Sequence, residues 1–162
     1  MQGTRHDDDF TDAIIRLGKL VLDFARVNRV TYWEDRETPE SDTDHTVMLG
    51  IIACAYASAY APHLDLGKIA QFSLVHDLVE VYAGDTPTAR ELSAEDKEAK
   101  DRREHESLLR IHTEFDQQLP WVSAQIESYE RLDTPEARFV KAIDKVLPKI
   151  THLLNSGTLL DK

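Results

Sequence analysis

The feature that most constrains this chain is a mostly apolar segment from Val47 to Ala61. It contains 15 residues, is rich in alanine, and is followed directly by Pro62. A segment of this length is shorter than the roughly 20 apolar residues that cross a bilayer. Proline lacks a backbone N–H and does not continue a helix. The segment therefore predicts a helix that is buried in a protein core and ends before Pro62.

Helical signals continue through nearly the whole chain. In residues 10–27, Ile14, Leu17 and Val21 recur at helical spacing. No stretch alternates apolar and polar residues over a length that would predict a strand. We expect helices at 10–27, 43–61, 66–83, 93–118, 121–131 and 134–155, with a loop at 28–42. The prediction is an all-α, single-domain helical bundle of about six helices.

Capping residues support several of these boundaries. Asp65 and Thr134 stand where an N-cap is needed, and Ser93 is followed three residues later by Asp96, which resembles a capping box. Pro135 occupies the first position of the last helix, where its fixed backbone angle is favourable. These positions predict where the helices begin.

Length, charge and cysteine content limit the biological setting. A chain of 162 residues fits one domain. We expect an acidic N-terminal tail at residues 1–9 and the domain at residues 10–162. Acidic residues at 7–9 occupy the place where a secretory signal needs positive charge and apolar residues. The single cysteine, Cys54, cannot form an internal disulfide, so we expect a cytoplasmic protein with Cys54 in the core.

The net charge of −11 argues against a nucleic acid polymer as partner, because clustered lysine and arginine bind phosphate backbones. No segment is long enough to predict a membrane span. A small phosphorylated substrate remains possible on this evidence, since a divalent cation and one or two arginines create a local positive site.

The run from His76 to Asp85 contains the strongest chemical signal. A histidine and an aspartate are adjacent at 76 and 77, and Glu80 follows four residues after His76, on the same helical face. Gly84 can adopt the left-handed conformation that ends a helix, which leaves Asp85 able to turn toward the same site. A neutral nitrogen and a carboxylate beside each other suit one cation. The run predicts a metal-centred active site.

Two further residues lie where polar side chains enter the core. His45 begins the apolar helix, and such a histidine alone also fits a hydrogen-bonded core residue. Asp144 borders the apolar stripe of the last helix, and a salt bridge to Lys141 or Lys145 would satisfy it. Pro148 removes the helical partner of the Asp144 carbonyl, which predicts a local kink.

With these residues the chain resembles the HD-domain phosphohydrolases, specifically their compact 5′-deoxynucleotidase branch. The family pattern is a histidine, a later His-Asp pair and a distant aspartate, matched here in order by His45, His76-Asp77 and Asp144. The longer signature of His-Asp, two residues, Glu, three residues and Gly-Asp is present from His76 to Asp85. The stretch from Thr134 to Lys145 is also similar to this branch.

The resemblance implies roles for the matching residues. The metal ligands would be His45, His76, Asp77 and Asp144, and the cofactor would be a divalent cation such as Mn, Co, Fe or Mg, which a mixed nitrogen and oxygen donor set suits. Glu80 would then be the general acid or base. Asp85 would position the attacking water or a sugar hydroxyl. Relatives of this type are commonly homodimers, which implies the same here.

The resemblance also implies an arginine that binds the substrate phosphate before the first ligand histidine. Arg29 is the best match, and Arg26 and Arg36 are alternatives. A guanidinium makes bidentate contacts with phosphate oxygens. The family often places a tryptophan beside this arginine, whereas here Val30 does so and Trp33 follows three residues later. Trp33 is therefore expected either against the sugar or as an anchor of the loop.

The activity implied is hydrolysis of (deoxy)nucleoside 5′-monophosphates to nucleoside and phosphate. A related hydrolase that releases pyrophosphate or triphosphate from nucleotides is an alternative. Alarmone hydrolysis fits less well, because Val81 rather than an aspartate follows Glu80. A catalytically silent ligand-binding module is the alternative outside the enzymes.

Overall fold

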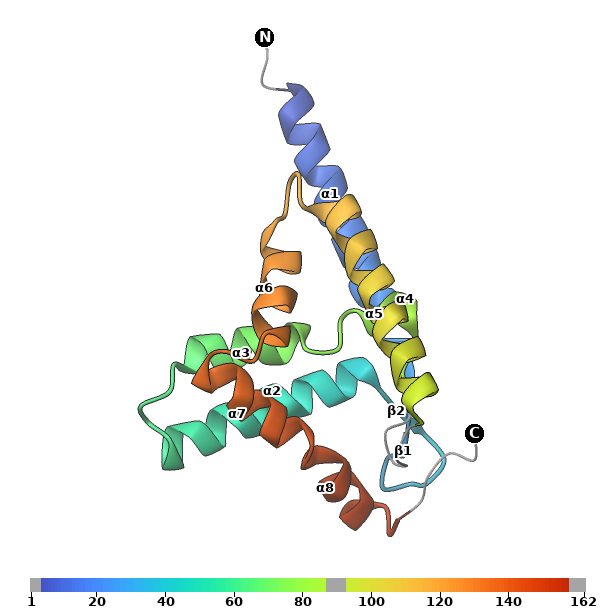
Figure 1. Cartoon of the computed structure of the whole chain (residues 1–162), viewed down its shortest axis with the longest axis vertical. Coiled ribbons are helices and arrows are strands. Elements are labelled where there is room, and N and C mark those ends of the chain that lie inside the picture. Colours follow the sequence, from blue (N-terminus) through green and yellow to red (C-terminus); the bar gives the residue numbers. More distant parts are fainter. Residues whose placement is uncertain (1–3, 87–92, 158–162) are drawn as a thin grey trace.

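The computed structural model describes residues 4–86 and 93–157, which form eight helices and one small sheet (Figure 1). The helices are α1 (Thr4–Phe24), α2 (Asp42–Tyr60), α3 (Leu66–Val75), α4 (Glu80–Ala83), α5 (Ala94–Phe115), α6 (Trp121–Glu130), α7 (Pro135–Asp144) and α8 (Leu147–Leu154). The strands are β1 (Asn28–Tyr32) and β2 (Pro39–Ser41). The all-α class is confirmed, because the sheet is minor.

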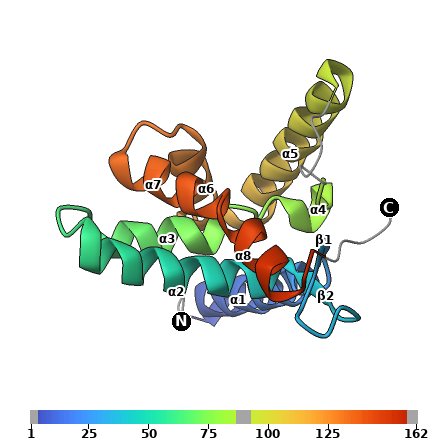
Figure 2. The same ribbon diagram turned by 90° about the horizontal axis from the view of Figure 1, so that it is seen from below.

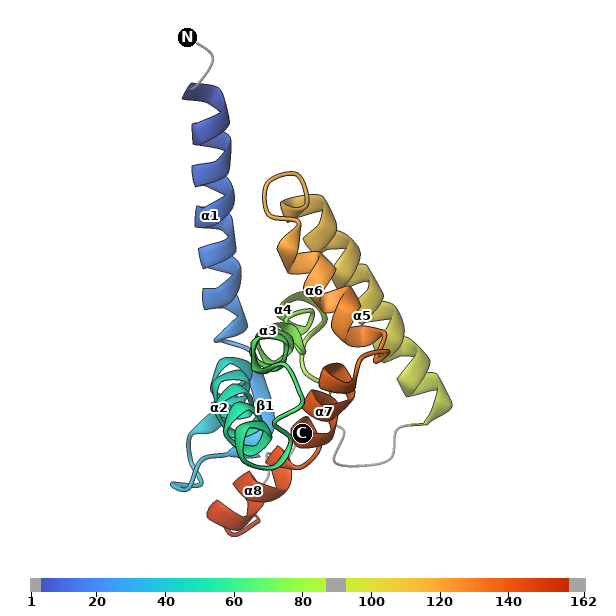
Figure 3. The same cartoon turned by 90° about the vertical axis from the view of Figure 1, so that its left-hand side faces the viewer.

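Two packed groups of helices make up the molecule. Helices α2 and α3 lie side by side, and α7 crosses them, as Figures 1 and 2 show. Helices α5 and α6 form an antiparallel pair, and α1 projects away from the body at its N-terminal end (Figure 3). None of the helices in the described part of the chain is long and apolar enough to cross a membrane.

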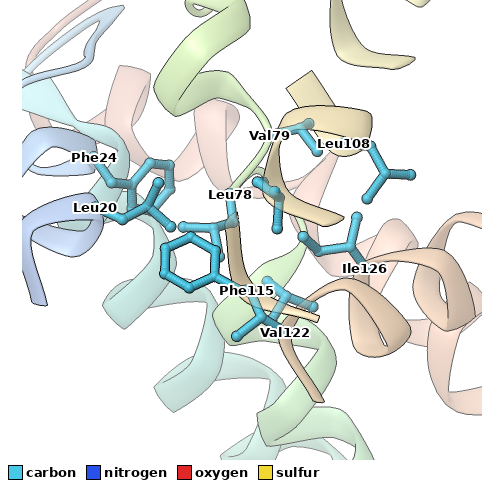
Figure 4. Packing of buried hydrophobic residues seen from close by; sticks show 10 residues of the cluster. Leu20, Phe24, Leu78, Val79, Leu108, Phe115, Val122 and Ile126 are labelled. Atoms are coloured by element: carbon cyan, nitrogen blue, oxygen red, sulfur yellow. The ribbon is translucent and has the colours of Figure 1, made fainter. Parts of the chain in front are cut away.

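Two apolar clusters hold these groups together. One joins α1, the segment around α4, α5 and α6, and includes Leu20, Phe24, Leu78, Phe115 and Ile126 (Figure 4). The other joins α2, α3, α6 and α7 around Leu49, Ile69, Phe72, Tyr129 and Val140. Cys54 packs half-buried against the second cluster and forms no disulfide, in agreement with the packing role expected for it.

The predicted caps are present. Asp65 accepts hydrogen bonds from the backbone N–H groups of Gly67 and Lys68, and Ser93 accepts one from Asp96. Thr134 caps α7 in the same way, with proline at the next position. Gly84 ends α4 with a positive φ of 73°, which favours glycine, although its ψ of 148° is outside the left-handed helical conformation expected there. Each of these interactions involves residues close in sequence, which explains why the sequence predicts them.

The helix expected at 66–83 is interrupted at residues 76–79, so two helices replace one. The His76 ring nitrogen Nδ1 donates to the carbonyl of Ser73 at 2.8 Å, and this carbonyl would otherwise accept from a helical backbone N–H. Tighter backbone bonds follow, including Glu80 N–H to the Asp77 carbonyl at 2.8 Å. The prediction that His76 and Glu80 share one continuous helix was therefore wrong, and the interruption turns His76 and Asp77 together toward α2 and α7.

The last predicted helix, at 134–155, is also divided. Helix α7 ends at Asp144 and α8 begins at Leu147, just before Pro148. The missing N–H of proline explains the break, which is larger than the kink expected from the sequence. These two interruptions turn the six predicted helices into eight.

The prediction of a loop at 28–42 was also wrong, because this segment contains an antiparallel hairpin. Asn28 pairs with Ser41 and Tyr32 with Pro39, with an irregularity between them. The strands are too short and irregular to give an alternating pattern. Side-chain contacts with distant residues hold them, including the bond from Asn155 Nδ2 to the Tyr32 carbonyl at 2.7 Å.

The first helix begins at Thr4 rather than at residue 10, so residues 4–9 of the expected acidic tail are helical. Residues 1–3 lie outside the described part of the chain.

Four elements meet at one place and position the site. They are the hairpin, the N-terminus of α2, the turn after α3 and the end of α7.

Candidate metal centre

Four side chains from three separate segments converge at this place. His45 lies in the first turn of α2, His76 and Asp77 follow α3, and Asp144 ends α7. His45 Nε2 lies 3.1 Å from Asp144 Oδ1, and His76 Nε2 lies 3.0 Å from Asp77 Oδ2 and 3.9 Å from Asp144 Oδ1. One potential ligand atom from each residue lies within 4.8 Å of the others. These are the four residues for which the sequence predicts metal binding.

The outer nitrogens of both histidines are already bonded. His45 Nδ1 lies 3.1 Å from Glu40 Oε1, and His76 Nδ1 donates to the Ser73 carbonyl at 2.8 Å. With a cation bound at Nε2, these contacts would hold the ring protons on Nδ1. His45 Nε2 itself lies within hydrogen-bond distance of Asp144 Oδ1. A backbone carbonyl or carboxylate on the far side of a ligand histidine commonly fixes its tautomer in metal sites.

The donor set fits a divalent cation. His76 Nε2 is buried and makes no hydrogen bond in the described structure, although it faces two carboxylate oxygens. Two imidazole nitrogens and two carboxylate oxygens form a mixed set that suits first-row divalent metals and magnesium rather than a thiolate-rich structural zinc site. A cation would compensate the negative charge that these residues bring into a mostly buried site.

Asp77 and Asp144 are both held in the charged form. Burial raises the pKa of Asp77, but His76 and Arg29 outweigh it and leave this pKa well below its usual value. For Asp144, burial is likewise outweighed by the hydrogen bond from His45, so its pKa is lowered. Asp144 Oδ2 also lies 3.3 Å from Lys141 Nζ, so the salt bridge considered from the sequence is present beside the metal-ligand arrangement.

Arg29 joins the hairpin to this centre. Its Nη1 donates to Asp77 Oδ2 at 2.8 Å and to Asp42 Oδ1 at 3.0 Å. The Asp42 side chain is fully buried, and its burial raises its pKa to about 6 despite the neighbouring guanidinium. The pKa of Arg29 is raised in turn, since Asp77 and Asp42 outweigh the effect of burial. Arg29 is therefore a fixed positive charge beside a metal-ligand candidate.

Glu80 lies at the edge of the four-residue cluster. Its Oε2 is buried and has no hydrogen bond among the described residues. Burial and the negative charges of Asp77, Asp42 and Asp85 raise the pKa of Glu80 to about 11. A carboxyl group with a strongly raised pKa beside a charged cluster can exchange a proton with a substrate.

Trp33 is not brought into the centre. It follows β1, is about half exposed, and its backbone N–H donates to the Thr38 carbonyl at 2.9 Å to close the hairpin. No contact between Trp33 and the cluster is present in the described residues. The side-chain role of Trp33 stays a prediction.

A cavity of about 330 Å³ opens beside the centre. His76 and Asp77 line one end, and α5 and the end of α6 form its walls with residues that include Lys100, Leu108 and Tyr129. This volume lies at the lower end of the range of about 300–1,000 Å³ for small-molecule sites. The arrangement can accommodate a small charged ligand next to the cluster.

Glu40 and Asp42 also belong to the site, although no sequence pattern identified them. Glu40 is 3% exposed and accepts hydrogen bonds from His45 and from Thr31 Oγ1. Both acids lie within residues 28–42, which were predicted to form a loop. The available signal was the position of an acid five residues before a candidate ligand histidine, which is meaningful only once the hairpin is known.

Comparison with known proteins agrees with this geometry. Residues 24–162 match the family model described as HD domain, and the chain therefore belongs to the HD-domain family. The chain is 32% identical over 135 residues to the 5′-deoxynucleotidase HDDC2 of Mus musculus, which covers 82% of this chain and 64% of the relative. It is 33% identical over 117 residues to the 5′-deoxynucleotidase hdd1 of Schizosaccharomyces pombe, covering 67% of this chain and 54% of that relative. The chain thus spans less than two thirds of the length of these relatives.

Solved structures show the same fold. A predicted metal-dependent phosphohydrolase from Magnetospirillum magnetotacticum MS-1 has a TM-score of 0.76 and 24% identity, covering 93% of this chain and 76% of that one. A conserved hypothetical protein from Pyrococcus furiosus has a TM-score of 0.64 and 25% identity, covering 89% of this chain and 81% of that one. The helical architecture is therefore shared by proteins of low sequence identity.

Proposed function

We propose that this protein is a metal-dependent phosphohydrolase that converts deoxynucleoside 5′-monophosphates to nucleoside and inorganic phosphate. The observation that carries the proposal is the convergence of His45, His76, Asp77 and Asp144, with the buried carboxyl group of Glu80 beside them. The similarity to relatives named 5′-deoxynucleotidase supports the choice of substrate class.

The four clustered residues would hold the cation through His45 Nε2, His76 Nε2 and one oxygen each of Asp77 and Asp144. A bound divalent cation, with Mn, Co, Fe and Mg as candidates, lowers the pKa of water and neutralises charge on a phosphate group. Glu40 and the Ser73 carbonyl keep the histidine protons on Nδ1, so the Nε2 atoms stay available. This support orients the ligands before substrate binds.

Glu80 would hold and transfer the proton at its Oε2. Its buried position and the surrounding carboxylates favour the protonated form until a positive charge offsets them. It can therefore donate to the departing nucleoside oxygen or accept from the attacking water. Asp85 would orient that water or a sugar hydroxyl, and Arg29 would bind a phosphate oxygen through donors that Asp42 and Asp77 do not use. Trp33 would contact the sugar if substrate binding moved the hairpin toward the metal centre.

A phosphate-release experiment tests the proposal. The purified protein is incubated with Mn²⁺ or Co²⁺ and a panel of nucleoside and deoxynucleoside mono- and triphosphates. Orthophosphate from the deoxynucleoside monophosphates is the expected product. Release of pyrophosphate or triphosphate instead would identify the alternative hydrolase, and no release by a metal-loaded protein would favour the silent module. Glu80→Gln is the matched control for contaminating phosphatases.

We further propose a homodimer located in the cytoplasm. The family resemblance supports the dimer, and so do exposed apolar residues on α1 and α2, including Ile15 at 64%, Leu22 at 65% and Ile51 at 65% exposure. Helix α1 projects from the body, where a second copy could cover it (Figure 3). Light scattering should give twice the mass of the chain, and Leu22→Lys should reduce it. A monomer at all concentrations would contradict the dimer.

A further inference from the structure

The cavity beside the metal centre is lined by both charged and apolar side chains. His76 and Asp77 belong to the metal centre, Leu108, Tyr129 and Leu132 contribute apolar surface, and Lys100 is one of the charged lining residues. A nucleoside monophosphate likewise combines a charged phosphate with a flat base whose faces are apolar. The cavity therefore offers partners for both parts of the proposed substrate.

Lys100 differs from the other basic residues in helical ion pairs. It pairs with Glu104 four residues later, as Lys19 does with Asp23 and Arg110 with Glu114. The side chain of Lys100 is 20% exposed, against 75% for Lys19 and 58% for Arg110. An ordinary surface pair keeps its cation in water. Lys100 instead lines the cavity that contains the metal-ligand candidates.

The charge of Lys100 is maintained in this position. Burial alone would lower its pKa, but the hydrogen bond and the charge of Glu104, with a smaller contribution from Asp77, outweigh burial and raise it. An ammonium group has three N–H donors, and its bond to Glu104 uses one of them. Donors therefore remain for a ligand.

A phosphate dianion in this cavity needs a cation among the lining residues. The cavity walls carry the acids Asp101, Glu104 and Glu130, which would repel it. Lys141 also lines the cavity, but it pairs with Asp144 and so belongs to the metal centre. Arg29 approaches from the hairpin and is not among the residues that line the cavity. Of the two lysines that line the cavity, Lys100 is the one without an ion pair to a metal-ligand candidate.

We propose that Lys100 binds the phosphate group of a nucleoside monophosphate held in this cavity, with Glu104 fixing its position. The inference rests on the proposed function and assigns a phosphate contact on the α5 side of the centre, in addition to Arg29. The base would lie along the wall formed by Leu108 and Leu132.

Binding measured without turnover tests this assignment separately from the proposed activity. The Mn²⁺-loaded Glu80→Gln variant is titrated with 2′-deoxyadenosine 5′-monophosphate and with 2′-deoxyadenosine by calorimetry. Lys100→Gln, Lys100→Arg and Lys97→Gln are added to that background. Lys97 lies on the same helix and is exposed, so it is the matched control. Bound manganese and helical content are measured for each variant.

Lys100→Gln should weaken binding of the monophosphate about 10- to 100-fold, as expected for loss of one charged hydrogen bond. Binding of 2′-deoxyadenosine should not change, Lys100→Arg should recover part of the affinity, and Lys97→Gln should match the background. An unchanged affinity for the monophosphate, an equal loss for the nucleoside, or no binding in the background would overturn the assignment. Phosphate release by the parent tests the activity independently, so a parent that binds through Lys100 without turnover would refute only the activity.

Discussion

Replacing Glu40 should reveal how far the metal centre depends on residues that do not touch the cation. Glu40 is 3% exposed and lies 3.1 Å from His45 Nδ1 through its Oε1, while its Oε2 accepts from Thr31. Burial raises the pKa of Glu40, but its bonds with His45 and Thr31 lower it below the usual value, so the carboxylate is charged. Glu40→Ala removes the acceptor for both buried donors at once.

The size of the effect follows from these two bonds. A buried donor left without a partner costs about 1–3 kcal/mol, so Glu40→Ala should lower the free energy of unfolding of the metal-free protein by about 2–6 kcal/mol. Loss of the partner of a ligand histidine typically reduces metal affinity by about 10–100-fold. Glu40→Gln should fall between parent and Glu40→Ala, because an amide oxygen still accepts from His45 Nδ1.

Two measurements separate stability from metal binding. Urea unfolding without metal gives the free energy of unfolding, and competition with a metal-chelating dye gives the affinity for Mn²⁺. Glu37→Ala is the matched control, since Glu37 lies exposed in the same hairpin. Parent-like Mn²⁺ affinity in Glu40→Ala would refute the idea that Glu40 orients His45.

Four further outcomes follow from the site. Asp144→Ala should lose metal and activity together, and full metal occupancy by elemental analysis would exclude Asp144 as a ligand. Glu80→Gln should reduce turnover by about 10²–10⁴-fold while bound metal stays constant, because the substitution removes a proton-transfer group; loss of metal would instead make Glu80 a ligand. Arg29→Ala should reduce turnover and lower the free energy of unfolding by about 3–5 kcal/mol, since it leaves the buried Asp42 and Asp77 without their cation. Arg29→Lys should give turnover and stability between those of the parent and of Arg29→Ala. Unchanged kinetics in Arg29→Ala, with a defect in Arg26→Ala or Arg36→Ala, would assign the phosphate contact to that other arginine. Burial and the bond to Glu114 raise the pKa of Tyr82 to about 12 from an ordinary value near 10. The stabilising effect of the Tyr82 hydroxyl is therefore complete below pH 10 and is lost as pH rises toward 12. The difference in unfolding free energy between parent and Tyr82→Phe should narrow over that range, and a constant difference would contradict this.

The helical class, most helix boundaries and the four metal-ligand candidates could be predicted from the sequence. Helix caps such as Asp65 and Thr134 act on backbone groups two or three residues away, so their effect is local. Pro148 acts in the same way through its own missing N–H. The ligand residues could be named because the spacing of His45, the His76-Asp77 pair and Asp144 resembles one family. Residues 24–162 then matched that family.

The contacts that support these residues could not be predicted from the sequence, because they depend on the tertiary structure. His45 and Asp144 are 99 positions apart, and no local rule states that their side chains lie 3.1 Å from each other. The hairpin is held by contacts with distant segments, such as Arg29 with Asp77, and its strands are too short to show a periodic pattern. The contacts of Glu40 and Asp42, and the position of Lys100 in the cavity beside the metal centre, depend on that packing. A polar residue becomes part of a site when the fold removes it from water and gives it a specific partner, and the partner here lies far away in the chain.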